Sequence, residues 1–376
     1  MQRFCLLIVF LFSLSWTFAQ RYSPLIAQKV SQVAGIEETL ITYEDFGPKP
    51  TGSIGIKNVN SWLVDYYTSL GYTVLLDSFL SGTASNIVIE KRGEDTTQWL
   101  IIGAHYDSVT DSYGANDNGS GVVATMQIAR LIADIPTALS VRIINFDAEE
   151  IGLLGSTHYV SNTLAKSDRV SLMFNVDQLG GTKFADNSKI VCERDEGNDV
   201  SQNDLPSLLK TDTLAALIAQ YTDLEPVIGP AFSTDYMPFE DSGYVITGLY
   251  QESNYSSFVH STADRVFNMD TDATEQVIKG AVAASLYFAR PLQTGVTSSE
   301  LVIYPNPAQG SFRLFAEEHS TLTYRIYNNV GQVVASGTNI DGSQVVTPMV
   351  SNGLYTVSIY TAEDQYISSA KLIIAR

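Results

Sequence analysis

Residues 99–121 read WLIIGAHYDSVTDSYGANDNGSG, and the fold class can be argued from this stretch. It begins with a short apolar run that ends at His105, and a polar loop carrying Asp107 and Asp117 follows. Residues 118–133 then place apolar side chains on one side of a helix. A strand, a loop and a helix in this order are typical of an α/β domain with a mostly parallel sheet.

The same alternation continues on both sides of this stretch. Apolar strand patterns occupy 72–79, 85–90, 141–147, 172–177 and 244–250, and helical periodicity occupies 57–70 and 273–290. We therefore expect residues 20–292 to form one α/β domain, in which helices flank a mostly parallel central sheet.

Four segments rich in carboxylates or histidine lie at or just after the ends of predicted strands. They are GAHYDSV (103–109), GANDNGSG (114–121), DAEEIGLLGS (147–156) and NVDQLGG (175–181). Ligands bind outside the carboxyl ends of the strands in an open α/β sheet, so these segments can converge on one crevice. Imidazole and carboxylate groups without thiolate suit Zn²⁺ or, less selectively, Mn²⁺ and Co²⁺.

Two of these candidate ligands also have ordinary structural explanations. His105 could play a structural part at the end of its strand, although Asp107 lies on the same side of an extended chain and could hold its tautomer. Asp117 could be a helix N-cap. The three glycines of 114–121 favour a different account, in which the backbone packs closely around a crowded site.

Glu149 and Glu150 are adjacent carboxylates that follow an apolar strand. Two buried carboxylates would repel each other unless a cation lay near them. Because neighbouring residues in a turn face different directions, one can bind a metal while the other reaches water held by that metal. His260, in FVHSTAD at 258–264, is a further candidate on a loop before the last helix.

Residues of about 50 to 290 resemble the secreted bacterial leucyl aminopeptidases, a family of co-catalytic di-zinc exopeptidases. GAHYDSV, GANDNGSGV, DAEEIGLLGS, NVDQLG and HSTAD occur in that family's order and spacing. The resemblance implies a hydrolase that binds two Zn²⁺ per chain, with Mn²⁺ or Co²⁺ as substitutes. It also implies peptide substrates with a free N-terminus.

The resemblance implies five metal ligands, which are His105, Asp117, Glu150, Asp177 and His260. His105, Asp117 and Asp177 would hold one ion. Asp117, Glu150 and His260 would hold the other, so that Asp117 bridges the two. The family also implies a cis peptide bond between Asp117 and Asn118.

The supporting residues carry over in the same way. Glu149 resembles the general base that activates the metal-bridging water, and Asp107 resembles the residue that orients His105. Thr234 could support the carboxylate of Asp177.

One segment departs from the family pattern. The family's Ser-Asp-His stands here as Thr234-Asp235-Tyr236, so tyrosine replaces a histidine. Stabilisation of the transition state could therefore come from Tyr236, from Tyr255 or from the metal alone. Phe232, Phe239 and Phe258 could provide apolar specificity, or could simply belong to the core.

Both ends of the chain carry features of an exported protein. Arg3 precedes an almost wholly apolar run at 4–16, and cleavage of a signal peptide is predicted after Ala19. An uncleaved membrane anchor is the alternative, and no later stretch is long and apolar enough to span a bilayer. Cys5 would leave with the signal, so Cys192 alone cannot form an intramolecular disulfide and should be a buried small hydrophobe.

The character of the sequence changes near Pro291. Residues 293–300 form a polar linker, and residues 301–376 contain short strands separated by turn residues, which predicts a small antiparallel β-sandwich. The tail resembles the C-terminal sorting domain of type IX secretion, through YPNPAQGSFRL (304–314), IYNNVGQVV (326–334), NGLYTVSI (352–359) and KLIIAR (371–376). This resemblance implies the type IX machinery as a partner and a secreted or cell-surface location.

Charge and chemistry leave three alternative functions open. A formal net charge of −19 argues against nucleic acid as the main partner. A glutaminyl cyclase has a similar fold but binds a single zinc, and a carboxypeptidase or dipeptidase is also possible. A non-catalytic surface-binding protein could keep the same fold, but it would not need Glu149 together with all five ligands.

Overall fold

The computed structural model describes residues 25–196, 200–251, 258–292, 301–315, 323–328, 331–338, 345–360 and 366–376. The predicted signal peptide, the predicted linker at 293–300 and Tyr255 lie outside these residues. The chain divides into two compact units, Met1–Leu292 and Gln293–Arg376. Within the described residues, no helix has the length and apolar character needed to cross a bilayer.

The first unit alternates strands and helices. Its strands are β1 Val74–Phe79, β2 Ala84–Lys91, β3 Asp95–His105, β4 Leu139–Phe146, β5 Arg169–Val176, β6 Gly181–Thr182, β7 Lys189–Arg194, β8 Glu225–Pro230, β9 Ile246–Tyr250 and β10 Met269–Asp270. Its α-helices are α2 Ile36–Glu44, α3 Ile54–Ser69, α4 Gly119–Ile132, α5 Leu154–His158, α6 Asp204–Tyr221, α7 Met237–Asp241 and α8 Thr271–Ala289. Three short helical turns are η1 Leu80–Gly82, η2 Tyr159–Thr163 and η3 Val266–Asn268.

Eight strands form one sheet in the order β1-β2-β4-β3-β5-β9-β7-β8. The pairs β3–β4, β3–β5, β5–β9 and β7–β8 are parallel, whereas β1–β2, β2–β4 and β7–β9 are antiparallel. The predicted α/β class with a mostly parallel sheet is therefore confirmed. Since β3, β4, β5 and β9 are parallel neighbours, their carboxyl ends meet at one edge of the sheet.

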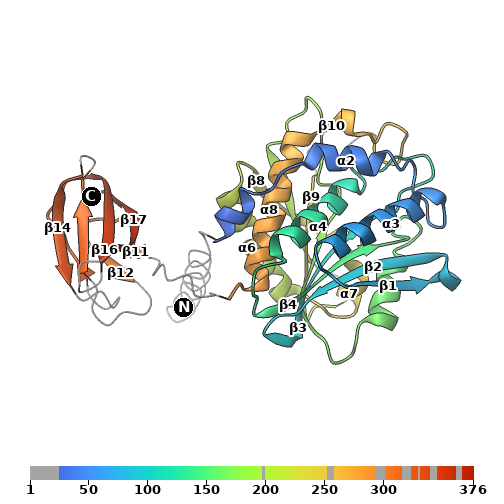
Figure 1. Cartoon of the computed structure of the whole chain (residues 1–376), viewed down its shortest axis with the longest axis horizontal. Coiled ribbons are helices and arrows are strands. Elements are labelled where there is room, and N and C mark those ends of the chain that lie inside the picture. The colour runs from blue at the N-terminus through green and yellow to red at the C-terminus, as the bar shows by residue number, and fades with distance from the viewer. Residues whose placement is uncertain are drawn as a thin grey trace. The chain divides into compact units, whose positions relative to one another are not determined.

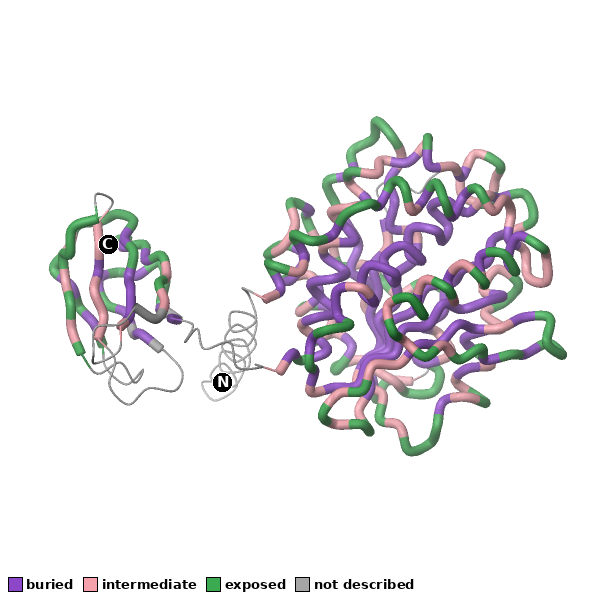
Figure 2. The backbone as a smooth tube through the Cα atoms, viewed as in Figure 1, coloured by how far each residue is buried: buried purple, intermediate pink, exposed green. Residues whose placement is uncertain are grey.

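Helices cover both faces of this sheet (Figure 1). Apolar residues of α2, α3, α4, α6 and α8 pack on one face, and residues of η2 and α7 pack on the other. All eight residues of β4 are buried, as expected for a strand covered on both sides. Figure 2 shows this buried centre, with exposed backbone mainly at the periphery of the unit. Cys192 is buried in it, as predicted.

The second unit consists of antiparallel strands. They are β11 Val302–Tyr304, β12 Phe312–Phe315, β13 Thr323–Tyr327, β14 Val333–Thr338, β15 Val345–Val346, β16 Gly353–Tyr360 and β17 Tyr366–Ile374. β11, β12 and β15 form one sheet, and β14, β13, β16 and β17 form another. Side chains from both sheets, including Phe312, Ile326 and Leu372, share one apolar core. The predicted β-sandwich is confirmed, and β15 is an addition to it.

Candidate metal centre

The carboxyl-terminal edge of the sheet gathers the five residues that the sequence singled out as ligands. Among the described residues they form two overlapping trios, in each of which the ligand atoms lie within 4.8 Å of one another. The first trio, which we call the inner trio, is His105, Asp117 and Asp177. The second, the outer trio, is Asp117, Glu150 and His260.

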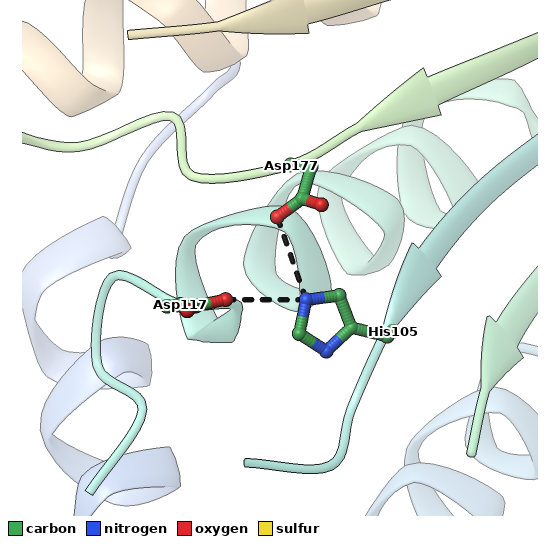
Figure 3. A group of neighbouring side chains, drawn as sticks. All are labelled: His105, Asp117 and Asp177. Atoms are coloured by element: carbon green, nitrogen blue, oxygen red, sulfur yellow. Dashed lines mark ion pairs between the residues drawn. The ribbon is translucent and has the colours of Figure 1, made fainter. Parts of the chain in front are cut away.

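Two members of the inner trio stand at strand ends, and all three are buried. Figure 3 shows Asp117 and Asp177 aimed at the same nitrogen of His105. The His105 Nε2 atom lies 3.2 Å from Asp117 Oδ1 and 3.4 Å from Asp177 Oδ1. His105 is the last residue of β3 and Asp177 follows β5, so the neighbouring strands fix their separation.

The outer trio is built on loops. The His260 Nε2 atom lies 3.0 Å from Asp117 Oδ2 and 3.1 Å from Glu150 Oε2. The His260 side chain is 56% exposed. Asp117 therefore presents one carboxylate oxygen to His105 and the other to His260, which is the arrangement expected of a ligand shared by two cations.

The start of α4 explains the position of Asp117. Asn118 is the N-cap of this helix and accepts a hydrogen bond from Gly121 N, while its side-chain amide donates to Val176 O on β5. A Cβ at Gly121 would lie 2.3 Å from both Asn118 Oδ1 and Val176 O, so only glycine allows this approach. The peptide bond between Asp117 and Asn118 is cis, as expected from the resemblance.

Asp264, to which we assigned no function from the sequence, fixes the same loop from the opposite side. Its Oδ1 accepts a hydrogen bond of 2.8 Å from Asn116 N, and its Oδ2 accepts one of 3.0 Å from Asp117 N. Asp264 is buried four residues after His260. It therefore ties the loop of one outer ligand to the backbone of the shared ligand.

Asp107 has a second contact besides His105. Its Oδ1 lies 3.4 Å from His105 Nδ1. The same oxygen accepts a hydrogen bond of 3.1 Å from Glu149 N, and Oδ2 accepts one of 3.2 Å from Glu150 N. Asp107 thus positions both the buried imidazole and the turn that carries the two glutamates.

Thr234 contacts Asp177 as proposed from the sequence. Its hydroxyl donates a hydrogen bond of 2.6 Å to Asp177 Oδ2 and accepts one of 3.1 Å from Asn175 Nδ2. Tyr236 lies elsewhere, because its hydroxyl donates to Glu193 Oε1 and accepts from Phe232 N. These two bonds occupy the Tyr236 hydroxyl, which was one candidate for stabilising the transition state.

The three phenylalanines considered for specificity have different environments. Phe239 is fully buried, and its ring packs against those of Phe146 and Tyr159 in the core. Phe232 is 56% exposed, and Phe258 is partly buried. Phe239 is therefore a core residue, whereas Phe232 is available to contact a ligand.

Burial and mutual repulsion dominate the electrostatics of the edge. Burial, together with nearby carboxylates such as Asp235, raises the pKa of Glu149 to about 9. Burial and the charge of Asp117 raise the pKa of Glu150 to about 8. The Asp117 carboxylate beside its ring raises the pKa of His260 to about 9. The edge therefore favours added positive charge.

The donor set fits zinc. Buried oxygens of Asp117, Glu150 and Asp177 have no hydrogen-bond partner among the described residues, which is costly unless something else binds them. Each trio offers one imidazole nitrogen and two carboxylates, and nitrogen and oxygen ligands of this kind suit Zn²⁺.

Comparison with known proteins finds aminopeptidases among the similar sequences. Aminopeptidase YwaD of Bacillus subtilis is 30% identical over 224 residues, which cover 58% of this chain and 47% of that protein. The chain spans about half the length of this and other curated relatives that it matches.

Solved structures share the fold. The Legionella pneumophila LapA aminopeptidase has a TM-score of 0.64 at 19% identity, over 72% of this chain and 76% of that one. A glutaminyl cyclase from Bacteroides thetaiotaomicron has a TM-score of 0.54 at 17% identity, over 66% and 95%. At such identities the two structures support the fold and do not choose between their activities.

Family models cover both units of the chain. Residues 302–375 match the secretion system C-terminal sorting domain, which confirms the resemblance of the tail. Residues 86–285, or 200 of the 376 residues, match peptidase family M28. This match spans all five candidate ligand segments. The chain therefore belongs to peptidase family M28.

Proposed function

We propose that this protein is a zinc aminopeptidase, which removes the first residue from peptides with a free amino terminus. The observation that carries the proposal is the Asp117 carboxylate, whose two oxygens face His105 and His260 separately. This geometry suits two cations side by side, one in each trio. We accordingly propose two Zn²⁺ per chain, with Mn²⁺ or Co²⁺ as substitutes.

Zinc, when bound, would polarise the scissile carbonyl and lower the pKa of a water, so that this water could give up a proton and attack the carbonyl near neutral pH. Glu149 belongs to neither trio, so its carboxylate is available to take the proton from the attacking water. It then delivers this proton to the departing amine. Asp107 fixes the backbone of Glu149 for both transfers through the 3.1 Å hydrogen bond.

A glutaminyl cyclase is the second candidate, because a cyclase shares the fold. Such cyclases bind a single zinc, whereas the two trios here share one carboxylate between two histidines. A peptide that begins with glutamine separates the two activities. The peptidase releases free glutamine, and the cyclase releases ammonia and leaves the peptide length unchanged.

We also propose that the tail directs the protein through type IX secretion to the medium or the cell surface. The match of residues 302–375 to a sorting domain supports this. Fusing residues 293–376 to a fluorescent reporter with a signal peptide, in a bacterium that has this system, should export the reporter. Retention of the fusion in the periplasm would contradict the proposal.

Aminoacyl-p-nitroanilides test the activity. The zinc-loaded protein should hydrolyse them, and a chelator should abolish the reaction until zinc is returned. Glu149→Gln should lower kcat by about 10²- to 10⁴-fold while retaining zinc. Glu37→Gln, on the exposed first turn of α2, is the matched control and should be unaffected. Chelator-resistant activity, or a Glu149→Gln variant as fast as the parent, would refute the proposal.

A further inference from the structure

Four residues form a row across the sheet, one step below the metal ligands. Gly103 on β3 pairs with Asn175 on β5, Asn175 pairs with Gly248 on β9, and Gly248 pairs with Glu193 on β7. His105 stands two residues further along β3, and Asp177 stands two residues beyond Asn175, just after β5. Two residues of a strand span about 6.6 Å, so this row lies about that far beneath the inner trio.

The Glu193 carboxylate occupies the space that a side chain at Gly248 would fill. A Cβ at Gly248 would lie 2.1 Å from Glu193 Oε2 and 3.0 Å from the ring of Tyr236. The carboxylate therefore lies over the sheet on the face where Tyr236 packs, and the glycine makes room for it.

This buried carboxylate is only half satisfied. Its Oε1 accepts a hydrogen bond of 2.9 Å from the Tyr236 hydroxyl. Its Oε2 is buried without a hydrogen-bond partner among the described residues, and so is the neighbouring Asn175 Oδ1. The adjacent Arg194 does not compensate it, because its guanidinium pairs with Asp212. In the ionised form, Oε2 is an acceptor without a donor, which is costly unless a donor from outside completes it.

Electrostatics point to the kind of donor that is missing. Burial raises the pKa of Glu193 to about 8, the Tyr236 hydrogen bond opposes this rise, and the charge of Asp177 adds to it. A cation beside Oε2 would reverse the effect of burial and restore the ionised form. A neutral donor would satisfy the hydrogen bond without offsetting the charge.

We propose that Glu193 is the floor of the subsite for the side chain of the substrate's first residue, and that it selects lysine or arginine there. This inference rests on the proposed aminopeptidase function and names its substrate class. The depth of the row below the inner trio is comparable to lysine's four-carbon stem, and Oε2 would receive the terminal ammonium or guanidinium.

Residues 231–234 adjoin this floor, because Ala231 N donates a hydrogen bond of 2.7 Å to the carbonyl of Arg194, next to Glu193. We infer that this segment is its cover. Glu193 is 2% exposed, so a substrate side chain reaches it only if the groups packed around it shift. Phe232 is the exposed part of the cover, and its ring lies 5.5 Å from that of Tyr250. A passing cation would meet these aromatic faces favourably. The bond from Phe232 N to the Tyr236 hydroxyl links the cover to Glu193.

Lysine and norleucine p-nitroanilides provide the test, because norleucine keeps the length of lysine without its ammonium. The zinc-loaded parent should have a kcat/KM for lysine at least about tenfold above that for norleucine. Glu193→Gln should lower the lysine value about ten- to a hundredfold and leave norleucine within about twofold. Glu225→Gln, on the exposed part of the adjacent β8, should change neither value.

Calorimetry of L-lysine and L-norleucine binding separates this inference from the proposed function. Hydrolysis of both substrates without a lysine preference, unchanged in Glu193→Gln, would overturn the subsite and leave the peptidase intact. If no substrate is cleaved, the proposed function fails. Tighter binding of lysine that disappears in Glu193→Gln would then support a cation site at Glu193, and equal binding would overturn it.

Glu193→Asp covers the case in which the glutamine variant does not fold. Aspartate keeps the negative charge, but its side chain is one methylene shorter. The preference should move from lysine toward the longer arginine by at least about threefold in kcat/KM. An unchanged ratio of lysine to arginine would count against direct contact between Glu193 and the substrate.

Discussion

The inner and outer trios share Asp117 but differ in their exposure to water. The side chains of His105 and Asp177 are 2% and 10% exposed, whereas that of His260 is 56% exposed. Charges interact more strongly where water is excluded, and strand ends hold ligands more rigidly than loops. The difference suggests two duties. The inner trio would hold its metal as part of the fold, and the outer trio would exchange its metal and meet the substrate.

Removing the shared ligand should have the largest effect. Asp117→Asn removes the charge that both trios need, so we expect less than one zinc per chain after dialysis and activity at background. Metal analysis by mass spectrometry measures the first, and p-nitroanilide hydrolysis measures the second. Asp111→Asn, on the exposed part of the same loop, should keep two zinc ions and full activity. Retention of one tightly held zinc in Asp117→Asn would mean that the trios do not depend on a common carboxylate.

The two histidines test whether the trios really differ. His105→Ala should lose the inner zinc and lower the melting temperature, because it leaves buried carboxylates without a partner. His260→Ala should keep the inner zinc and lose only the outer one. His158 lies outside both trios, so His158→Ala should keep two zinc ions. The comparison fails if His260→Ala loses both ions, or if each histidine variant retains the same single ion with the same affinity.

How far the sequence predicted this site depends on where each residue lies along the chain. Four of the five ligands stand at strand ends or on loops beside glycines, so local pattern and resemblance together located them. His260 has no glycine near it, and it was located by the resemblance. Asp107 was predicted to orient His105, but its bonds to the backbone of Glu149 and Glu150 were not foreseen, since they depend on how two loops pack.

Other features required the strand order, which sequence periodicity does not contain. β7 and α6 were not predicted. β7 pairs antiparallel with β9, although its other neighbour β8 is parallel to it and β9 is parallel to β5. Only this pairing places Glu193 against Gly248. Asp264 is separated from Asp117 by 147 positions. The resemblance placed its segment HSTAD with the site, but nothing in the sequence indicated that the Asp264 carboxylate meets the backbone of Asp117.

Asp264→Asn should weaken both trios equally, unlike either histidine variant. The NH₂ group of the asparagine would face one of the two backbone N–H groups whose hydrogen bonds the carboxylate now accepts, and two donors cannot bond each other. Zinc affinity at both sites should fall by about ten- to a hundredfold, the usual effect of losing an outer partner of a ligand. Competition with a fluorescent chelator measures it, and Asp272→Asn on α8 is the exposed control. A change confined to the outer ion would show that Asp264 acts through His260 instead.

The melting temperature should depend on pH differently in the metal-free and zinc-loaded forms. Folding raises the pKa values of Glu149, Glu150 and His260 to between about 8 and 9. A group whose pKa is raised by folding stabilises the fold when the pH is below its pKa in the unfolded chain. That stabilisation is lost as the pH rises through its pKa in the folded protein. The melting temperature of the metal-free protein should therefore fall between about pH 5 and 9. Zinc replaces the lost protons, so the zinc-loaded protein should keep its melting temperature, and a constant gap between the two forms would contradict this account.

Thr234→Val should have the smallest effect, and only on the inner trio. Valine keeps the shape of threonine but removes the donor that lies 2.6 Å from Asp177 Oδ2, and it leaves Asn175 Nδ2 without its acceptor. Affinity for the inner zinc should fall by about tenfold, while the outer zinc should bind as before. Thr213→Val on the exposed face of α6 makes the same chemical change away from the site and should bind both ions normally. Because Asp177 belongs to the inner trio alone, an equal loss at both ions would mean that the trios are coupled through more than Asp117.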